Sequence, residues 1–338
     1  MIARVLAGLV VVPLLLGAAA APADREHIVF RFADSAIDES SALVVLPGGL
    51  FATTNDSGDT GRVFTVDGSG RTVGVTTWSP DPTDVEALAP APDGDVWVGD
   101  IGDNRSVRDS VQVAKVPVGR GDRSVSPAVY DLVYPDGAHD AETLLCDPAT
   151  GRLYVASKSW LGGTLYAAPA HLSTEHPNRL RALAPVLPVA TDGAFWPDGK
   201  HVIVRGYGAA EIYTWPAMRE VADLDLPRQP QGEGIGIAAD GTVYAGSEGL
   251  HAEVITVPLP ADARAALQGA SSSASPSPSV PSSPSQSPSP SQSSSPSPAN
   301  QQHSEAEEET ERSWWPWALG GLVGLVAIGV LLRSLRPR

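Results

Sequence analysis

The sequence contains one cysteine, three lysines and far fewer basic than acidic residues. Cys146 alone cannot form an intrachain disulfide, and its place in the apolar run TLLC predicts a small buried side chain. Lysine and arginine together number 23 against 39 acidic residues, and the net charge of −16 argues against a nucleic-acid partner. The zinc motif H-E-x-x-H, the Walker loop and the G-x-S-x-G motif are absent from the sequence, so it carries no signature of those enzyme classes.

The first 23 residues predict a secretory signal peptide. One basic residue, Arg4, precedes an apolar run from Val5 to Leu16, and small residues with an A-x-A arrangement follow. Cleavage is expected after Ala21 or Ala23; the alternative is an N-terminal anchor that is retained in the membrane. The scarcity of lysine relative to arginine is typical of GC-rich bacterial genomes, so we expect an exported bacterial protein.

The C-terminal part of the chain predicts a stalk and a membrane anchor. Residues 261–301 are expected to form a disordered stalk, because Ala270 to Pro298 is almost entirely serine and proline. An acidic juxtamembrane segment, 302–313, follows, and the uncharged apolar run 314–332 is long enough for one transmembrane helix. Tryptophans at the outer end of this run, the acidic segment before it and arginines in the tail 333–338 predict that the C-terminus is cytoplasmic. The alternative, a buried core helix, has no neighbouring domain to bury it.

Residues 24–260 contain five copies of one pattern. An acidic residue opens a short apolar run, a glycine turn interrupts it, and a second apolar run ends on a charge. The turn glycines are Gly49, Gly94, Gly151, Gly199 and Gly241, with spacings of 45, 57, 48 and 42 residues. A repeat of about 40–50 residues in a strand-rich chain is typical of a β-propeller. We therefore predict an all-β, five-bladed propeller, followed by one C-terminal transmembrane helix.

The segment from His27 to Phe32 belongs to none of the five copies. The fifth copy has only three strands, so this segment is expected to pair with it and close the ring. A sixth blade would need a further inner strand in the long second interval, and no such strand is evident there.

Two charged positions recur within the repeat. The first opens the inner strand, and the second lies where the next strand ends, six or seven residues after the turn glycine. The first set is Glu39, Glu86, Glu142, Asp192 and Glu233, and the second is Asp56, Asp100, Lys158, Arg205 and Glu248. Antiparallel neighbours place the start of one strand beside the end of the other, so both sets are expected at one mouth of the central channel.

Three arrangements of these charges are open at this point. Carboxylates that lie close together raise each other's pKa unless something compensates them. A hard cation such as Ca²⁺ could bind among their oxygens. Alternatively, Lys158 and Arg205 could neutralise them, or each acid could accept backbone N–H bonds from the next blade and hold the ring together.

Other candidate groups are weaker. The loops Asn55 to Asp59 and Asp100 to Asn104 are acidic and rich in glycine, but they lack the oxygen spacing of an EF-hand and are expected to be ordinary turns. His139 is a candidate general base near the mouth or a solvated loop residue. The tryptophans Trp78, Trp97, Trp160, Trp196 and Trp215 are expected to pack within the blades rather than to form a sugar-stacking platform.

Five motifs in order resemble exported bacterial propellers of the esterase-like phytase type and related actinobacterial propellers. They are ESSALV with NDSGD, DVEAL with GDIGDNR, DAETL with YVASK, DGKHVIVRGY, and QGEGI with SEG. The resemblance implies Ca²⁺-assisted phosphomonoester hydrolysis at a carboxylate-rich mouth. It implies that metal is held by Glu39, Asp56, Glu86, Asp100, Asp103, Glu142, Glu233 and Glu248, with Glu86, Lys158 and Arg205 as catalytic residues. The chain has few extra basic residues for a polyphosphate, which argues against phytate itself.

The function expected from the sequence is the binding of a small molecule or cell-envelope ligand at the charged mouth, with Ca²⁺ as the candidate cofactor. The alternatives are a metal-dependent phosphoester or ester hydrolase, and a scaffold or adhesion module without a central site. The protein is expected to be a monomer, attached to the membrane only by its C-terminal helix.

Overall fold

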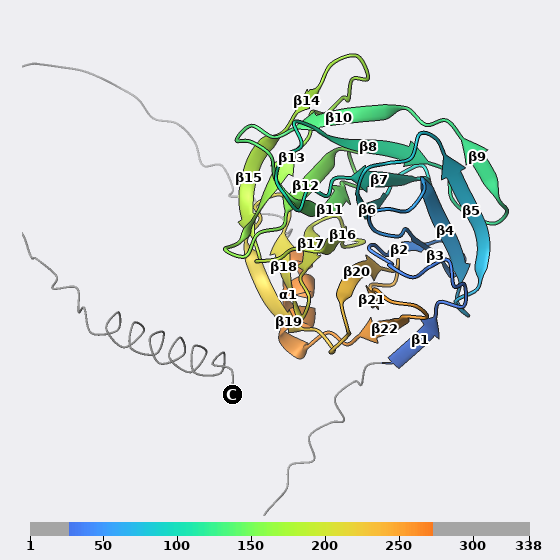
Figure 1. The fold of residues 1–338 in the computed structure, drawn as a ribbon. Helices are drawn as coiled ribbons and strands as arrows, with labels where there is room; N and C mark the ends of the chain where they lie inside the picture. The colour runs from blue at the N-terminus through green and yellow to red at the C-terminus, as the bar shows by residue number, and fades with distance from the viewer. Residues whose placement is uncertain (1–26, 273–338) are drawn as a thin grey trace, which may run out of the picture. The chain divides into compact units, whose positions relative to one another are not determined.

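A computed structural model describes residues 27–272 of the chain as five antiparallel sheets arranged around a common axis (Figure 1). The predicted signal peptide, most of the stalk, the acidic segment, the apolar run 314–332 and the basic tail lie outside the described residues. Within residues 27–272, no helix is long and apolar enough to cross a membrane.

Each sheet is one blade, and its first strand is the innermost. Blade 1 contains β2 (Val44–Leu46), β3 (Leu50–Thr53), β4 (Arg62–Asp67) and β5 (Thr72–Trp78). Blade 2 contains β6 (Val85–Pro90), β7 (Val96–Asp100), β8 (Val111–Val116) and β10 (Val129–Val133). Blade 3 contains β11 (Ala141–Cys146), β12 (Leu153–Ser157), β13 (Gly163–Ala167) and β15 (Arg181–Val186). Blade 4 contains β16 (Asp192–Phe195), β17 (His201–Arg205), β18 (Ala209–Thr214) and β19 (Glu220–Asp225).

Blade 5 closes the ring with a strand from the start of the described chain. It contains β20 (Gly232–Ile237), β21 (Val243–Ser247) and β22 (Glu253–Val257), with β1 (His27–Arg31) outermost. β1 pairs antiparallel with β22, from His27 opposite Thr256 to Arg31 opposite Glu253. This closure and the five-blade count confirm the sequence prediction. The inner strands β2, β6, β11, β16 and β20 contact one another in turn around the axis (Figure 1).

Two short strands were not predicted. β9 (Arg123–Val125) adds to the outside of blade 1, parallel to β5, and β14 (Asn178–Arg179) adds to blade 2, parallel to β10. Each comes from a connection that leaves its own blade and covers the outer edge of the preceding one. The long second interval of the repeat therefore supplies an edge strand and not a sixth blade.

The prediction that the stalk starts at residue 261 is wrong for its first twelve residues, which form α1 (Ala261–Ser272). The sequence ADARAALQGA is rich in alanine, the best helix former, and Asp262 lies in the first turn, where a negative charge favours a helix. Ala263 is fully buried, and Leu259 and Leu267 pack against the core between blades 4 and 5. The helix is thus part of the propeller's packing.

The hydrophobic core consists of five clusters, and each lies between two neighbouring blades. The inner strands are buried on both faces, which is why their sequences are nearly continuous apolar runs. Cys146 is buried in the cluster between blades 2 and 3, as predicted. Because apolar side chains fill the space between blades, polar groups gather where the inner strands begin.

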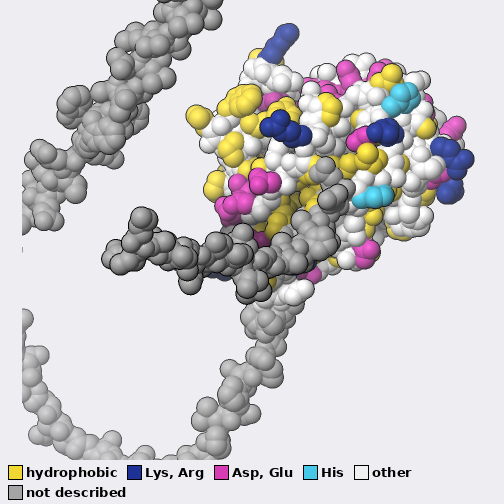
Figure 2. Space-filling model, turned by 90° about the horizontal axis from the view of Figure 1, so that it is seen from below, with side chains coloured by type: hydrophobic (Ala, Val, Ile, Leu, Met, Phe, Trp, Pro, Cys, Tyr) yellow, Lys and Arg dark blue, Asp and Glu magenta, His cyan; other side chains and the backbone are white. Residues whose placement is uncertain are grey.

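The surface seen from the side of the propeller has basic side chains mostly as separate spots among acidic and apolar ones (Figure 2). A nucleic-acid-binding surface would instead need clustered positive charge. On this face the basic side chains form no extended patch, and the net charge of the whole chain is −16.

Candidate functional site

The mouth is defined here as the end of the ring where inner strands begin and the next strands end. In blade 2, Val85 pairs with Asp100 and Ala87 with Gly99, so the intervening Glu86 is an extra, bulged residue. Glu142 in blade 3 and Glu233 in blade 5 lie in the corresponding bulges of their own blades. A bulge redirects a side chain. Burial raises the pKa of Glu86 and of Glu142, and the charge of Glu142 adds to the shift of Glu86 as the charge of Glu233 adds to that of Glu142. The structure therefore brings them together.

Glu39 does not belong to this set. In blade 1 the pairing of Ser40 with Asn55 makes Ser41 the bulged residue, so Ser41 occupies the place that Glu86 has in blade 2. Ser41 Oγ donates a hydrogen bond to Glu86 Oε2 at 2.7 Å. The Glu39 side chain is exposed, and its carbonyl accepts the Asp56 N–H at 3.0 Å. The sequence prediction therefore placed the repeated position two residues too early in blade 1, at Glu39 instead of Ser41.

The second set of charges divides into two groups, because side chains alternate along a strand. Asp56, Lys158 and Glu248, seven residues after their glycines, contribute to the charge around the buried glutamates. Asp100 and Arg205, which lie six residues after their glycines, instead form hydrogen bonds with backbone groups. Asp100 accepts the Thr83 N–H, and Arg205 donates to the Gly234 carbonyl. A difference of one residue thus separates the groups.

Asp100 and Asp103 shape a loop. Asp100 Oδ1 accepts bonds from the Asp84 N–H at 2.9 Å and from Arg108 Nη1 at 2.8 Å. Asp103 Oδ2 accepts the Arg108 N–H at 2.7 Å, and both carboxylates are buried. Although they were predicted as metal ligands, these oxygens are occupied in holding residues 100–108 in place.

Three carboxylates, here named the acidic triad, converge beside this loop. One oxygen each from Asp56, Asp84 and Glu86 lies within 4.8 Å of the other two. Two ligands on opposite sides of Ca²⁺ are separated by about 4.8 Å, given bonds of about 2.4 Å, so one ion fits among these oxygens. The Asp84 Oδ1 atom is buried and has no hydrogen-bond partner among the described residues. These residues fit a hard divalent cation.

Electrostatics in the triad favours a cation. Burial, and then the charges of Asp56 and Asp140, raise the pKa of Asp84 to about 6. Burial also raises the pKa of Glu86, and Glu142 and Asp56 add to the shift, although the bond from Ser41 opposes it. Asp84 and Glu86 therefore hold their protons more tightly than usual until a positive charge replaces them.

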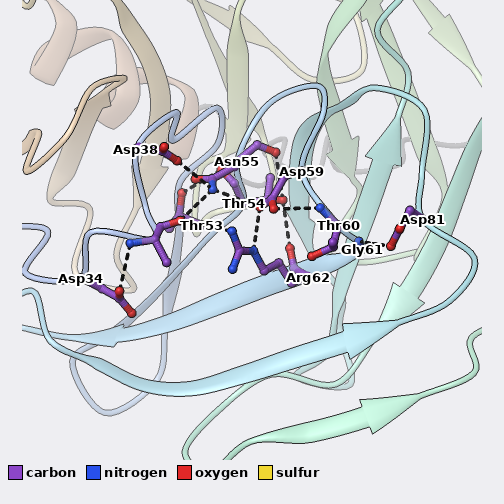
Figure 3. A network of polar contacts seen from close by, with 11 residues as sticks. Asp34, Asp38, Thr53, Thr54, Asn55, Asp59, Thr60, Gly61, Arg62 and Asp81 are labelled. Carbon is purple, nitrogen blue, oxygen red and sulfur yellow. Dashed lines mark hydrogen bonds and ion pairs between the residues drawn. The ribbon is translucent and has the colours of Figure 1, made fainter.

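A network around Asn55 fixes the loop that carries Asp56 (Figure 3). Asn55 Nδ2 donates to the Ala36 carbonyl at 2.8 Å, to Asp38 Oδ1 at 3.2 Å and to Asp59 Oδ2 at 3.0 Å. Arg62 Nε donates to the same Asp59 oxygen at 2.7 Å. The loop from Asn55 to Asp59, expected to be an ordinary turn, is thus held at both ends. Asp56 is positioned by this scaffold without depending on a metal.

Gly102 leaves room for the triad. A Cβ atom at this position would lie 2.4 Å from Asp84 Oδ2 and 2.8 Å from Glu86 Cγ. These separations are far below a van der Waals contact, so only glycine permits the two carboxylates to approach the loop.

Next to the triad, Glu142, Glu233, Glu248 and Lys158 form a mixed group. Lys158 Nζ pairs with Glu142 Oε1 and lies 5.3 Å from the centre of the Tyr207 ring. Burial raises the pKa of Glu248 to about 7, with Glu233 and Asp56 contributing. Glu142 and Glu233 are only 4% and 2% exposed, and the Oε2 atom of each has no hydrogen-bond partner among the described residues.

Asp192 and Arg205 are instead sealed between blades. Asp192 accepts N–H bonds from Gly193 at 2.7 Å, Ile235 at 2.7 Å and Leu43 at 3.3 Å, and thereby links three blades. Burial raises its pKa, although these bonds act in the opposite direction. Arg205, also fully buried, donates from Nη1 to the carbonyls of Gly234 and Gly246 at 2.9 and 3.1 Å. This pair matches the expectation of an acid that holds the ring together.

Two residues outside the predicted set prove relevant to the mouth. Asp84 and Asp140 each lie two positions before a bulged glutamate, in the repeated pattern D-x-E of Asp84-Val-Glu86 and Asp140-Ala-Glu142. This spacing was a detectable signal, since residues two apart on a strand face the same side.

His139, the candidate base, lies 3.0 Å through Nε2 from both Asp136 Oδ1 and the Tyr166 hydroxyl.

No protein-family model and no curated protein matches the sequence. Among solved structures, the chain is similar to hydrazine synthase from Kuenenia stuttgartiensis, with 15% identity and a TM-score of 0.37. The alignment covers 62% of this chain and 56% of that one. At this level of likeness nothing about function is transferred from it.

Proposed function

We propose that the protein is an exported, membrane-anchored propeller that binds a divalent cation, Ca²⁺, at the acidic triad, and a cell-envelope ligand at the same mouth. The observation that carries this proposal is the convergence of Asp56, Asp84 and Glu86 within 4.8 Å, with an unpartnered, buried oxygen on Asp84. The proposal of export and anchoring rests on the signal-peptide pattern of the first 23 residues and on the apolar run 314–332.

The triad suits Ca²⁺ because this ion prefers carboxylate and carbonyl oxygens in a flexible geometry of six to eight ligands. Three protein oxygens leave several coordination positions for water and for oxygen atoms of a ligand. The fixed loop of Asp56 and the glycine at position 102 supply a site that is assembled before the ion arrives. Preorganisation of this kind favours binding, because less freedom is lost when the ion enters.

Binding is better supported than hydrolysis. In the hydrolase alternative, Lys158 and Arg205 would stabilise charge that develops on a substrate. Arg205 is fully buried and donates to carbonyls, and the Lys158 ammonium is paired with Glu142. Arg205 is therefore not free to meet a phosphoryl group, and the charge of Lys158 is already balanced by Glu142. Glu86, the third predicted catalytic residue, is a member of the triad.

The test is thermal unfolding of the full-length chain with Ca²⁺ and with a chelator. An ion at 100 times its dissociation constant stabilises the folded state by about 2.7 kcal/mol, which for this size raises Tm by roughly 5–10 °C. Glu86→Gln keeps the size of the side chain and removes a ligand charge, so the calcium-dependent shift should largely disappear.

Glu39→Gln is the matched control, because it makes the same change at an exposed position of the same mouth. Its calcium-dependent shift should equal that of the unaltered chain. Equal Tm values for the unaltered chain in Ca²⁺ and in chelator would contradict the proposal.

A further inference from the structure

A second feature of the mouth is a cavity of about 680 Å³ beside the triad. Loops of blades 2, 3 and 4 form it, and its lining includes His139, Asp140, Lys158, Trp160 and Tyr207. Asp140 Oδ1 accepts the Asp103 N–H at 2.8 Å, and the adjacent Gly102 N–H donates to the Asp84 carbonyl at 3.2 Å. The cavity and the triad are therefore parts of one mouth, and the size of the cavity suits a small organic molecule.

The wall of the cavity carries exposed apolar side chains on a fixed turn. Trp160 is 81% exposed and Leu161 is 99% exposed, which corrects the expectation that Trp160 packs within a blade. The carbonyl of Ser159 accepts N–H bonds from Gly162 at 3.2 Å and Val189 at 2.9 Å, so the turn is held to the propeller. An exposed indole on a fixed turn, with the half-exposed Tyr207 lining the same cavity, is a platform for a ring-shaped ligand.

The polar groups of the cavity suit hydroxyl groups. Lys158 lines the cavity and can donate from its ammonium group, while Asp140 in the same lining offers carboxylate oxygens as acceptors. A hydroxyl group can donate to such an oxygen and accept from the ammonium at the same time.

The charges favour a neutral ligand over an anion. Lys158 is paired with Glu142, and the remaining nearby charges include Asp140, Glu233 and Glu248. An anionic group in the cavity would thus meet more negative than positive charge. Stacking faces, hydroxyl-compatible polar atoms and a net negative environment together describe a site for an uncharged polyol ring.

We infer that the cavity lined by Lys158, Trp160 and Tyr207 binds a neutral saccharide, whose ring stacks on Trp160 while its hydroxyl groups contact Lys158 and Asp140. This inference deepens the proposed function by naming its ligand class, and it rests on that function for the idea that the mouth binds a ligand. Sugar hydroxyls are also oxygen donors, so they can complete the coordination of an ion at the triad.

The test is binding of the full-length chain to an array of neutral and acidic oligosaccharides, followed by affinity measurement for those that bind. At least one neutral oligosaccharide should bind, and Trp160→Ala should weaken its affinity by roughly tenfold or more. Leu250→Ala removes a side chain that is 59% exposed on a loop of blade 5, outside the cavity, and should leave the affinity unchanged. Trp160 packs in no core cluster, so its removal should not affect folding.

Three results would overturn the inference: no bound oligosaccharide, binding that survives Trp160→Ala, or selective binding of acidic oligosaccharides. Repeating the measurement in chelator separates the two proposals. Sugar binding that persists without Ca²⁺ supports the saccharide site even if the calcium-dependent Tm shift is absent. A calcium-dependent shift without any sugar binding supports the cation site and contradicts the saccharide site.

Discussion

Blades 2 and 4 place charged residues near the same repeat positions but use them differently. Each places a buried acid near the start of its inner strand and a charge at the end of the next strand. In blade 4, Asp192 accepts three backbone N–H bonds and Arg205 donates to carbonyls of the neighbouring blade. In blade 2, Glu86 has one hydroxyl partner and otherwise faces the carboxylates of Asp56 and Asp84.

The difference shows that burial of a charge does not by itself mark a functional site. A buried charge whose hydrogen-bonding capacity is filled by the chain stabilises the assembly of blades. Carboxylates that face other carboxylates lower stability unless a cation or proton joins them. The charges of blade 4 therefore hold neighbouring blades together, whereas those of blade 2 form the proposed cation site, and each assignment can be tested separately.

The largest effect is expected from breaking blade 4. Arg205→Met keeps much of the side-chain volume but removes the bonds to the carbonyls of Gly234 and Gly246 and leaves Asp192 without its nearby cation. Leaving a buried carbonyl without its hydrogen-bond donor costs about 1–3 kcal/mol, so the loss of both bonds should cost about 2–6 kcal/mol. Denaturant unfolding should show a loss of this size.

Lys115→Met is the comparison for this loss, because it replaces a cation by methionine in the same way but at the surface, where Lys115 pairs with Asp93. Exposed pairs contribute about 0–1 kcal/mol, so this variant should remain close to the unaltered chain. Similar unfolding midpoints for Arg205→Met and Lys115→Met would show that Arg205 does not hold the blades together.

An intermediate effect is expected from Gly102→Ala in blade 2. The added methyl group would lie 2.4 Å from Asp84 Oδ2 and must displace it, so the calcium-dependent rise in Tm should be lost. Overpacking typically costs about 1–3 kcal/mol of stability. Gly208→Ala is the control, because a Cβ at Gly208 meets no atom within 4 Å. Retention of the full calcium effect in Gly102→Ala would remove the triad from consideration as the cation site.

The fold was predictable from the sequence because it depends on repetition. Each blade has its own turn glycine and paired apolar runs, and the unassigned segment His27 to Phe32 identified the closing strand. Strands β9 and β14 were not predictable, because each is a few residues long and pairs with the blade before its own. Helix α1 was missed because the Ser/Pro-rich composition that follows it was extended too far toward the propeller.

The site was predictable only in outline. Spacing correctly placed Glu86, Glu142 and Glu233 near one another, since they share a position in the repeat. In blade 1 the same count from the turn glycine leads to Ser41, because Ser41 lies eight residues before Gly49 as Glu86 lies eight residues before Gly94, and the choice of Glu39 overlooked this spacing. Spacing could not show which charges find backbone partners, as Asp192 does, because those partners come from other blades.

The smallest effect in this comparison is the pH dependence of stability in chelator. Asp84, with a pKa raised to about 6, and Glu248, with a pKa raised to about 7, keep protons in the folded state that the unfolded chain releases at lower pH. Their contribution to stability is complete below pH 4 and is lost as the pH rises through 6 to 7.

We therefore expect the free energy of unfolding in chelator to fall by roughly 1–2 kcal/mol between pH 5 and pH 8, since one pKa unit corresponds to about 1.4 kcal/mol and solvent screens these two partly exposed carboxyls by more than half. Saturating Ca²⁺ should oppose this fall, because the ion binds the ionised carboxylates that the proton leaves. Urea unfolding at both pH values, with and without Ca²⁺, measures the four free energies. A stability in chelator that rises from pH 5 to pH 8 would mean that these acids are not held near one another, and blade 2 would then resemble blade 4.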